Sequence, residues 1–176
     1  MKKVIVFGAS NSKVSINQQL AMYAGSKLTD VRVESLNLND FEMPIYGMDR
    51  EVENGIPEQA TAFSELLGTA DGFIVSFAEH NGAYSTAFKN IFDWVSRINP
   101  KMWNNKPVVL MATSPGARGG QTVLDIAKGR MPYHGATVVG SFSVPSFGEN
   151  FKENKIINKS LDAELDIIIQ DFIKAL

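Results

Sequence analysis

The sequence contains no cysteine, no long apolar run and no surplus of either charge. The absence of cysteine excludes disulfides, thiolate nucleophiles and cysteine-based metal sites. No segment approaches the roughly 20 apolar residues of a membrane helix, and the apolar run at 4–7 is shorter than the ~7–15 residue core of a secretory signal. The 17 basic and 19 acidic residues nearly balance, without a basic run that would contact nucleic acid or a membrane surface. We therefore expect a cytoplasmic protein with no nucleic-acid partner and no membrane association.

Short apolar segments alternate with helical patterns along the chain. The 176 residues are a natural length for one domain, and neither a linker nor an internal repeat divides them, so we predict a single domain over 1–176. A capping box of Ser15 and Gln18 predicts the start of the first helix, and Pro57 predicts the start of the second. Further helices are predicted after the third and fourth apolar segments and from about Ser160. The predicted strands are 4–7, 31–38, 72–77, 107–112 and 137–144.

This alternation predicts a parallel sheet with helices on both faces, because right-handed crossovers place helices on either side. Five strands favour the flavodoxin-like order 2-1-3-4-5 over the six-strand dinucleotide order. The switch point of that order lies between strands one and three. A ligand is therefore expected at the loops that follow strands one, three and four.

The first of these loops places hydroxyl groups in front of a helix N-terminus. Ser10, Ser12 and Ser15 precede the predicted helix, whose free N–H groups and dipole favour an anion. The spacing matches neither the Gly-x-Gly-x-x-Gly fingerprint nor an NTPase P-loop. A mononucleotide phosphate fits better, which predicts a preference for FMN over FAD. The alternative is a polar turn in which Ser15 only caps the helix.

The other two loops are polar and rich in glycine. Backbone N–H groups at Asn81 and Gly82 are candidates to face the edge of a flat heterocycle, and Tyr84 or His80 is a candidate to lie near its ring. A lone loop histidine is more often solvated, so we assign no catalysis to it. The loop at 114–120 permits close backbone approach, and its Arg118 is either a contact for a flavin or a nicotinamide phosphate, or an exposed loop residue.

With these loops in place, the chain resembles the NAD(P)H-dependent FMN reductases, which include relatives acting on quinones, azo dyes and chromate. In the first loop, Ser10, Ser15 and Asn17 match the family pattern, whereas Ser12 stands where the family usually has arginine. The segments 44–46 and 55–58 resemble the family's long connection after strand two. The second loop keeps Glu79, Asn81, Gly82, Tyr84, Lys89 and Asn90, and 114–120 is close to the family's third motif.

The resemblance implies that the first loop binds the FMN phosphate and that the other two bind the ring. The cofactor-binding residues it implies, together with the loop chemistry, are Ser10, Ser12, Ser15, Ile16, Asn17, Glu79, His80, Asn81, Gly82, Ser114, Gly116, Arg118 and Gly119. Loss of the family arginine at Ser12 is expected to weaken FMN roughly 10- to 100-fold unless Lys13 compensates, since a charge-assisted hydrogen bond contributes ~1.5–3 kcal/mol.

The implied activity is hydride transfer from NADPH or NADH to FMN and then to a small acceptor. The flavin supplies the electronics, so we name no catalytic side chain and no metal ligand. Three alternatives remain open: a quinone or azo-compound reductase on the same scaffold, an FMN-binding electron carrier that is not an enzyme, and a flavin-free module that retains the fold.

A homodimer or homotetramer is also expected, with an interface at the helix after strand three and the loop 41–56. At ~100° per residue, Trp94 projects away from the sheet-facing stripe, so we expect a partner to cover it. The alternative is that a loop of its own chain covers Trp94, near Trp103. Apolar residues of the 41–56 loop, among them Ile45 and Met48, add surface for an interface. Family members commonly form dimers with the flavin near the subunit boundary.

Overall fold

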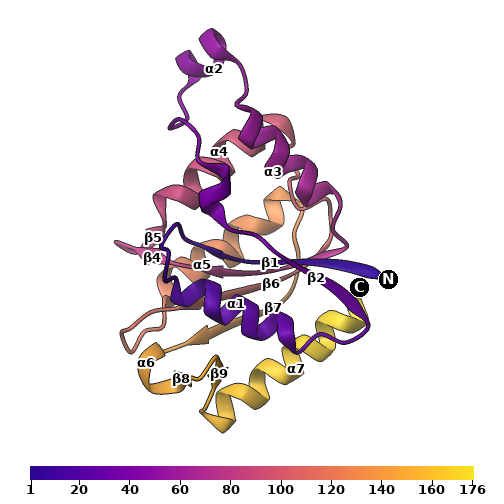
Figure 1. Ribbon diagram of the computed structural model, residues 1–176, viewed down its shortest axis with the longest axis vertical. Coiled ribbons are helices and arrows are strands. Elements are labelled where there is room, and N and C mark those ends of the chain that lie inside the picture. Colours follow the sequence, from indigo (N-terminus) through magenta and orange to yellow (C-terminus); the bar gives the residue numbers. More distant parts are fainter.

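Five parallel strands form the central sheet of the computed structural model, which describes residues 1–176 (Figure 1). Their order confirms the predicted flavodoxin-like topology, with β6 and β7 as the fourth and fifth strands. Across the sheet they are β2 (Val31–Ser35), β1 (Lys2–Ala9), β3 (Gly72–Phe77), β6 (Pro107–Thr113) and β7 (Thr137–Val144).

The second strand is shorter than its apolar pattern predicts. It ends at Ser35, and Asn37 caps the 3-10 helix η1 (Leu38–Phe41). Leu36 and Leu38 continue the apolar alternation because both are buried, although neither belongs to the strand. The prediction of a strand to residue 38 was therefore wrong, because burial persists where the chain turns out of the sheet.

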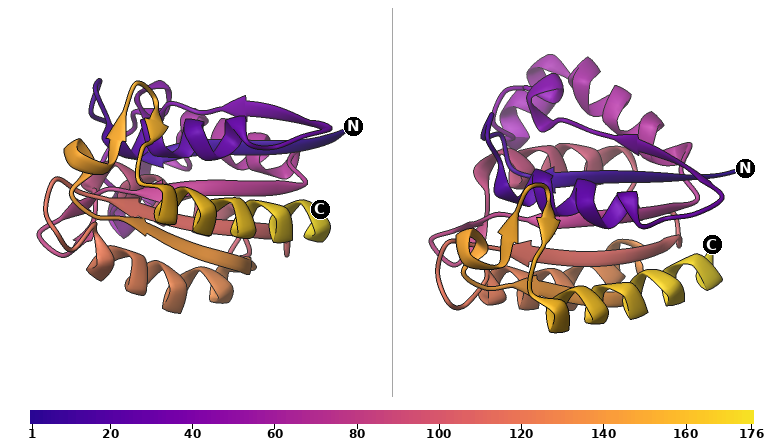
Figure 2. Two further views of the ribbon diagram at one scale, coloured as in Figure 1. Left: turned by 90° about the horizontal axis from the view of Figure 1, so that it is seen from below. Right: turned by 60° about the horizontal axis from the view of Figure 1, so that its bottom comes forward.

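Helices cover both faces of the sheet (Figures 1 and 2). α1 (Ile16–Ser26) and α7 (Lys159–Ala175) pack on one face, where Val4 and Val6 belong to their core cluster. The opposite face, with Ile5 and Phe7, is covered by α3 (Glu58–Gly68), α4 (Thr86–Ile98) and α5 (Gln121–Arg130). Successive strand residues thus enter different cores, which explains the continuous apolar runs. None of the helices combines the length and apolar character that a membrane crossing requires.

Smaller elements follow the carboxyl ends of β3 and β7. A hairpin of β4 (Glu79–His80) and β5 (Ala83–Tyr84) lies after β3. After β7 come α6 (Phe147–Asn150) and a second hairpin of β8 (Phe151–Lys152) and β9 (Lys155–Ile156). Figure 2 shows this second hairpin beside α1. The rings of Phe151 and Tyr23 meet edge to face with centroids 5.8 Å apart, within the ~4.5–7 Å typical of aromatic pairs. The 3-10 helix η2 (Met131–His134) directly follows α5.

The long connection after β2 forms an arm that carries α2 (Met48–Asn54) away from the body (Figure 1). Its base covers Trp94, which is fully buried and donates its indole N–H to the Pro44 carbonyl at 2.7 Å. Tyr46 packs edge to face on the indole, with centroids 5.0 Å apart. The expectation that Trp94 faces a partner was therefore wrong, and the alternative of cover by its own chain is correct. Helical periodicity correctly predicted that Trp94 points away from the sheet. It did not predict that the base of the arm folds back and covers the side chain.

Candidate functional site

The ends of β1, β3 and β6 bring three loops together at one edge of the sheet. We call residues 10–15 the first loop, 78–85 the second loop and 114–120 the third loop. A cavity of about 280 Å³, the three-loop cavity, lies between them. Predicted residues that line it are Ser10, Ser12, Ser15, Ile16, Asn17, Glu79, His80 and Ser114, and residues the prediction missed are Val14, Ala78, Thr113 and Pro115.

Close packing of α1 against β1 sets the position of the first loop. A Cβ atom at Gly8 would lie 2.7 Å from Gln18 Cα and 2.8 Å from the Asn17 carbonyl carbon, so only glycine fits there. Ser15 caps α1 by accepting the Gln18 N–H at 3.1 Å. A capping box would also require the Gln18 carboxamide to accept the Ser15 N–H, and this second bond is absent. The carboxamide accepts from the Gly8 N–H at 2.6 Å and donates to Ser35, and so joins the ends of β1 and β2.

The first loop presents hydrogen-bond donors without partners. The N–H groups of Asn11, Lys13 and Ser15 donate to no group of the protein, and the first turn of α1 adds further free N–H groups. The hydroxyls of Ser10, Ser12 and Ser15 each accept a backbone N–H, which leaves their own protons free to donate. Free N–H and O–H groups at a helix N-terminus fit the phosphate group of a mononucleotide such as FMN.

Asn17, on α1, links the ends of β3 and β6 at the cavity wall. Its side-chain oxygen accepts from the Ser76 hydroxyl at 2.7 Å and from the Thr113 N–H at 3.1 Å. Its amide nitrogen donates to the Thr113 carbonyl at 3.2 Å. The carboxamide is thus occupied within the protein, and the backbone N–H of Asn17 is the part left for a ligand. Ser85 adds a second link by donating its hydroxyl to the Ala9 carbonyl at 2.8 Å.

The second loop is a tight hairpin whose turn is formed by Asn81 and Gly82, at φ values of 52° and 76°. This backbone suits the Asn-Gly pair. Both N–H groups donate to no protein group, yet neither residue lines the three-loop cavity. The Glu79 carboxylate accepts the Val123 N–H at 3.0 Å and thereby ties the loop to α5. His80 is exposed at the cavity wall.

Tyr84 points into the protein rather than toward the cavity. Its ring packs against Phe77 and Phe88, with centroid distances of 5.4 and 5.2 Å. Burial raises the pKa of its hydroxyl, and the buried hydroxyl oxygen has no hydrogen-bond partner. The Tyr84 ring therefore packs in the core beneath the second loop. Because Tyr84 does not line the three-loop cavity, it is not placed to contact a ligand ring there.

Close packing requires glycine at position 119 of the third loop. A Cβ at Gly119, whose φ is 59°, would lie 2.8 Å from the Pro145 nitrogen and closer still to the Ser143 hydroxyl. The Gly116 carbonyl accepts the N–H groups of Gly119 and Ser146. Neither glycine lines the cavity. Arg118 is exposed and donates to the Thr122 hydroxyl at 2.9 Å, which places it at the outer side of the loop.

A second hollow of about 420 Å³ adjoins the cavity, and His80 lines both. We call it the arm hollow, because most of its walls come from η1, the base of the arm and α4. Half of its lining residues are apolar. Sequence patterns missed it because its residues come from a helix and a long loop that are distant in sequence. One signal was available, because Asn90 was among the residues that match the family's second motif. In the structure its carboxamide donates to the Met43 and Pro44 carbonyls and accepts the Tyr46 N–H of the arm base.

A five-stranded flavodoxin-like sheet with free hydrogen-bond donors at its switch point is typical of mononucleotide-binding α/β proteins. The chain belongs, within that class, to the NADPH-dependent FMN reductase family, whose model matches residues 2–149. These residues include all three loops. The resemblance drawn from the loop motifs is thereby confirmed.

Relatives with assigned activities are similar over part of their length. A 2-hydroxy-1,4-benzoquinone reductase of Burkholderia sp. is 31% identical over 119 residues, which cover 66% of this chain and 63% of the relative. A quinone reductase of Escherichia coli (strain K12) is 33% identical over 79 residues, covering 45% and 42%. The match thus spans less than two thirds of each relative. The FerB flavoenzyme NAD(P)H:(acceptor) oxidoreductase from Paracoccus denitrificans shares the fold, with a TM-score of 0.79, 21% identity and coverage of 99% and 97%.

Proposed function

We propose that the protein is an NAD(P)H-dependent FMN reductase. The observation that carries this proposal is the set of free N–H and O–H donors at the α1 N-terminus, which opens on the three-loop cavity. In this proposal Ser10, Ser12, Ser15 and the N–H groups of Ile16 and Asn17 hold the phosphate. Bound FMN supplies the chemistry, by accepting a hydride from the nicotinamide and passing electrons to a small acceptor.

The second and third loops then orient the flavin ring. His80 and Ser114 stand at the cavity wall, while Glu79 fixes the spacing between the two loops through its bond to α5. The free N–H groups of Asn81 and Gly82 are proposed to reach a polar ring edge. Gly116 and Gly119 give the third loop its shape, and Arg118 is proposed to meet a nicotinamide phosphate at the outer rim.

Flavin titration and nicotinamide oxidation test this proposal separately. We expect FMN to bind and to make NADPH or NADH oxidation dependent on flavin. No binding at tens of micromolar FMN would remove the proposal. An FMN-loaded protein without turnover on either nicotinamide would identify an electron carrier instead. The cytoplasmic location expected from the sequence stays a prediction.

A quinone reductase is a second candidate, favoured by the arm hollow. Its half-apolar walls suit a flat, apolar acceptor, and His80 connects it to the three-loop cavity. The Burkholderia and Escherichia coli relatives are named for quinone reduction. Steady-state rates with a benzoquinone, an azo dye and free FMN as acceptors distinguish these activities. Turnover with free FMN alone would remove the quinone candidate.

Replacing Ser12 by arginine is expected to tighten FMN binding by about 10-fold or more. Ser12 is exposed on the first loop, and its hydroxyl accepts only a long 3.4 Å contact from the Val14 N–H. A guanidinium there gains a charge-assisted hydrogen bond to phosphate, which contributes ~1.5–3 kcal/mol. Calorimetric titration with FMN and with riboflavin measures the change. The gain should be confined to FMN, since riboflavin has no phosphate.

Ser160→Arg is the matched control, because it adds the same charge at an exposed position on α7. It is expected to leave both affinities within about twofold of wild type. Equal tightening of FMN and riboflavin by Ser12→Arg, or equal tightening of FMN by both variants, would contradict the assignment of the phosphate to the first loop.

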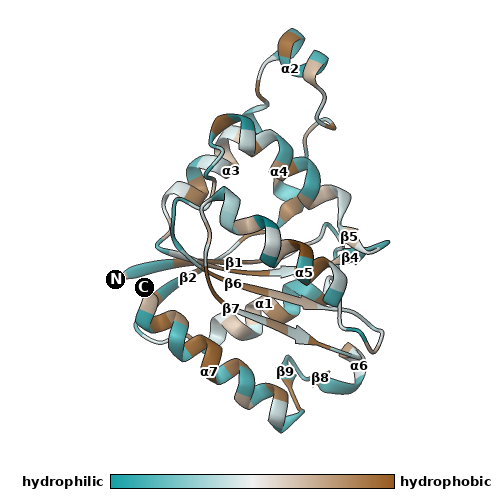
Figure 3. Ribbon diagram, turned by 180° about the vertical axis from the view of Figure 1, so that it is seen from behind, coloured by the Kyte–Doolittle hydropathy of each residue, from teal (hydrophilic) through white to brown (hydrophobic).

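We further propose that the protein forms a homodimer through its arm. After Trp94 is covered, apolar side chains remain exposed on the arm: Ile45 at 67%, Met48 at 71% and Val52 at 81%. Figure 3 shows hydrophobic residues on the projecting α2. Clustered exposed apolar residues usually mark an interaction site.

Val52→Glu is expected to convert the dimer to a monomer at micromolar concentration, because it places a charge in the apolar contact. Light scattering after size-exclusion chromatography measures the change. Ile167→Glu makes the same exchange at another exposed position, on α7, and is expected to leave the dimer intact. A monomeric wild type, or a dimer that survives Val52→Glu, would refute the role of the arm.

A further inference from the structure

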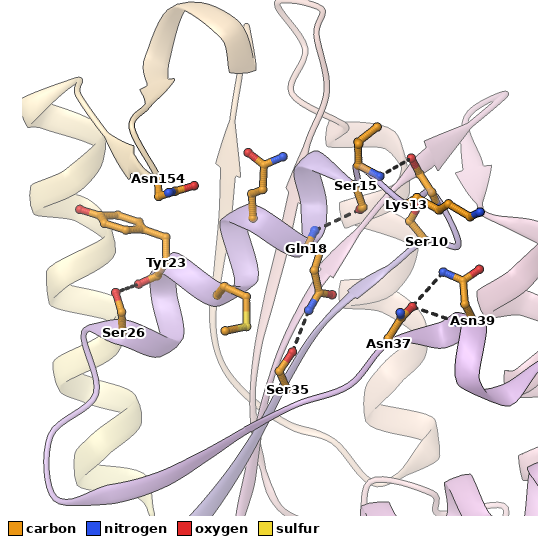
Figure 4. A pocket seen from close by; sticks show the side chains of 14 residues that line it. Ser10, Lys13, Ser15, Gln18, Tyr23, Ser26, Ser35, Asn37, Asn39 and Asn154 are labelled. Carbon is orange, nitrogen blue, oxygen red and sulfur yellow. Dashed lines mark hydrogen bonds between the residues drawn. The ribbon is translucent and has the colours of Figure 1, made fainter.

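A larger hollow, about 660 Å³, runs along the outer side of α1, and we call it the outer groove (Figure 4). One end is the first loop, with Ser10, Lys13 and Ser15. The other end is formed by Tyr23 and Ser26 of α1, with Asn154 overhanging from the β8–β9 hairpin. This groove shares the first loop with the three-loop cavity and is separate from the arm hollow, and the proposed flavin reductase activity makes no use of the part beyond the first loop.

The chemistry of the outer groove suits an anion with many polar groups. No aspartate or glutamate lines it, although the chain has 19 acidic residues, and Lys13 is its one charged side chain. Most other lining residues carry hydroxyl or carboxamide groups. Those of Gln19 and Asn154 form no hydrogen bond within the protein, so they are free to bind the ligand.

The outer groove and the three-loop cavity meet at the first loop. Ser10, Ser12, Val14 and Ser15 line both. Ser10 and Ser15 are each only 8% exposed, and their hydroxyl protons donate to no group of the protein. A phosphate bound to these hydroxyls therefore has the cavity on one side and the groove on the other. A terminal monophosphate leaves the groove unused, whereas a pyrophosphate leads into it.

We propose that the outer groove holds the adenylate half of flavin adenine dinucleotide, so that the protein binds FAD as well as FMN. This inference rests on the proposed flavin function. The sequence of the first loop alone predicted a preference for FMN, on the assumption that the ligand ends at its phosphate. The outer groove instead provides space for a ligand that continues beyond the phosphate. The groove continues where an FMN phosphate would end.

The far part of the groove offers a surface for a flat base. Met22, which is 42% exposed, and Tyr23 both line this part of the groove, and the Tyr23 hydroxyl donates to Asp162 at 2.6 Å, which holds its ring in place. The Phe151 ring meets the Tyr23 ring edge to face, with centroids 5.8 Å apart, and Lys27 Nζ lies 4.8 Å from the centroid of the Tyr23 ring. Apolar contact from Met22 and Tyr23, with carboxamides at the edge from Gln19 and Asn154, matches the apolar faces and polar edge of adenine.

Titration of wild type and Met22→Glu with FMN and FAD tests the inference. In wild type, we expect the two flavins to bind within about threefold of each other. Met22→Glu places a carboxylate in the groove, away from the three-loop cavity, and is expected to weaken FAD by about 10-fold or more. FMN affinity should stay within about twofold. Met22→Gln controls for the loss of methionine, and Thr29→Glu adds the same charge at an exposed site outside the groove.

The two flavins separate failure of this inference from failure of the proposed function. FMN binding with FAD more than about 10-fold weaker would overturn the outer groove as an adenylate site and leave the FMN proposal standing. Equal weakening of both flavins by Met22→Glu, or no weakening of FAD, would overturn it as well. Absence of binding by either flavin would overturn both proposals.

Discussion

Replacing Gly8 by alanine is expected to destabilise the fold by about 3 kcal/mol or more and to abolish FMN binding. The added methyl group would lie 2.7 Å from Gln18 Cα and 2.8 Å from the Asn17 carbonyl carbon. Both are backbone atoms of α1, so no side chain can rotate away. Relief requires α1 to move off β1, which misplaces its N-terminus and the first loop. Overpacking of a close-packed interior commonly costs ~1–3 kcal/mol and sometimes more.

Urea unfolding and FMN titration measure these two effects. Gly129→Ala is the matched control, because a Cβ there has nothing within 4 Å and the residue lies in α5. It is expected to be neutral or to stabilise the fold by up to ~1 kcal/mol, since alanine is the better helix former. A Gly8→Ala protein with wild-type stability would show that α1 can shift without strain.

The arrangement of the sheet was predictable because strands buried on both faces are nearly continuous in apolar residues. β3 is buried at every position, so its run of apolar residues predicts a central strand directly. The end of β2 was not predictable from this pattern. Leu36 and Leu38 stay buried after the chain has left the sheet, so the apolar alternation continues past the last strand residue.

The location of the candidate site was predictable, but the partner of each polar side chain was not. Strand order places the three loops at one edge whatever their internal contacts are. Asn17 and Glu79 match ligand-binding motifs, yet their side chains bind other segments of the protein. A sequence shows that a polar group needs a partner. It does not show whether that partner is a ligand or a strand end 96 residues away, as for Asn17 and Thr113.

The same limit applied to Trp94. Its direction on α4 followed from helical periodicity, whereas its cover came from Pro44 and Tyr46 in a loop without regular structure. A hydrogen bond from an indole to a backbone carbonyl leaves no pattern in the sequence. The outer groove was missed for a similar reason, since α1 and the β8–β9 hairpin that form its far end are distant in the chain.

Replacing Asn17 by alanine is expected to cost about 2–4 kcal/mol of folding free energy and to weaken FMN by at least about 10-fold. The change removes hydrogen bonds to the Ser76 hydroxyl, the Thr113 N–H and the Thr113 carbonyl. Ser76 and Thr113 are 0% and 1% exposed, so water does not replace the lost partner without rearrangement. A buried polar group left unpaired costs ~1–3 kcal/mol. Loss of this link also frees the ends of β3 and β6, which carry the second and third loops.

Urea unfolding gives the stability change, and flavin titration below the unfolding transition gives the affinity of the folded fraction. Gln170→Ala is the matched control, since it truncates an exposed carboxamide on α7 that forms no hydrogen bond and is expected to leave both quantities unchanged. Riboflavin should weaken together with FMN, because Asn17 positions the loops proposed for the ring as well as the helix N-terminus. An Asn17→Ala protein that loses stability but binds both flavins as wild type does would show that the ends of β3 and β6 keep their positions without this carboxamide.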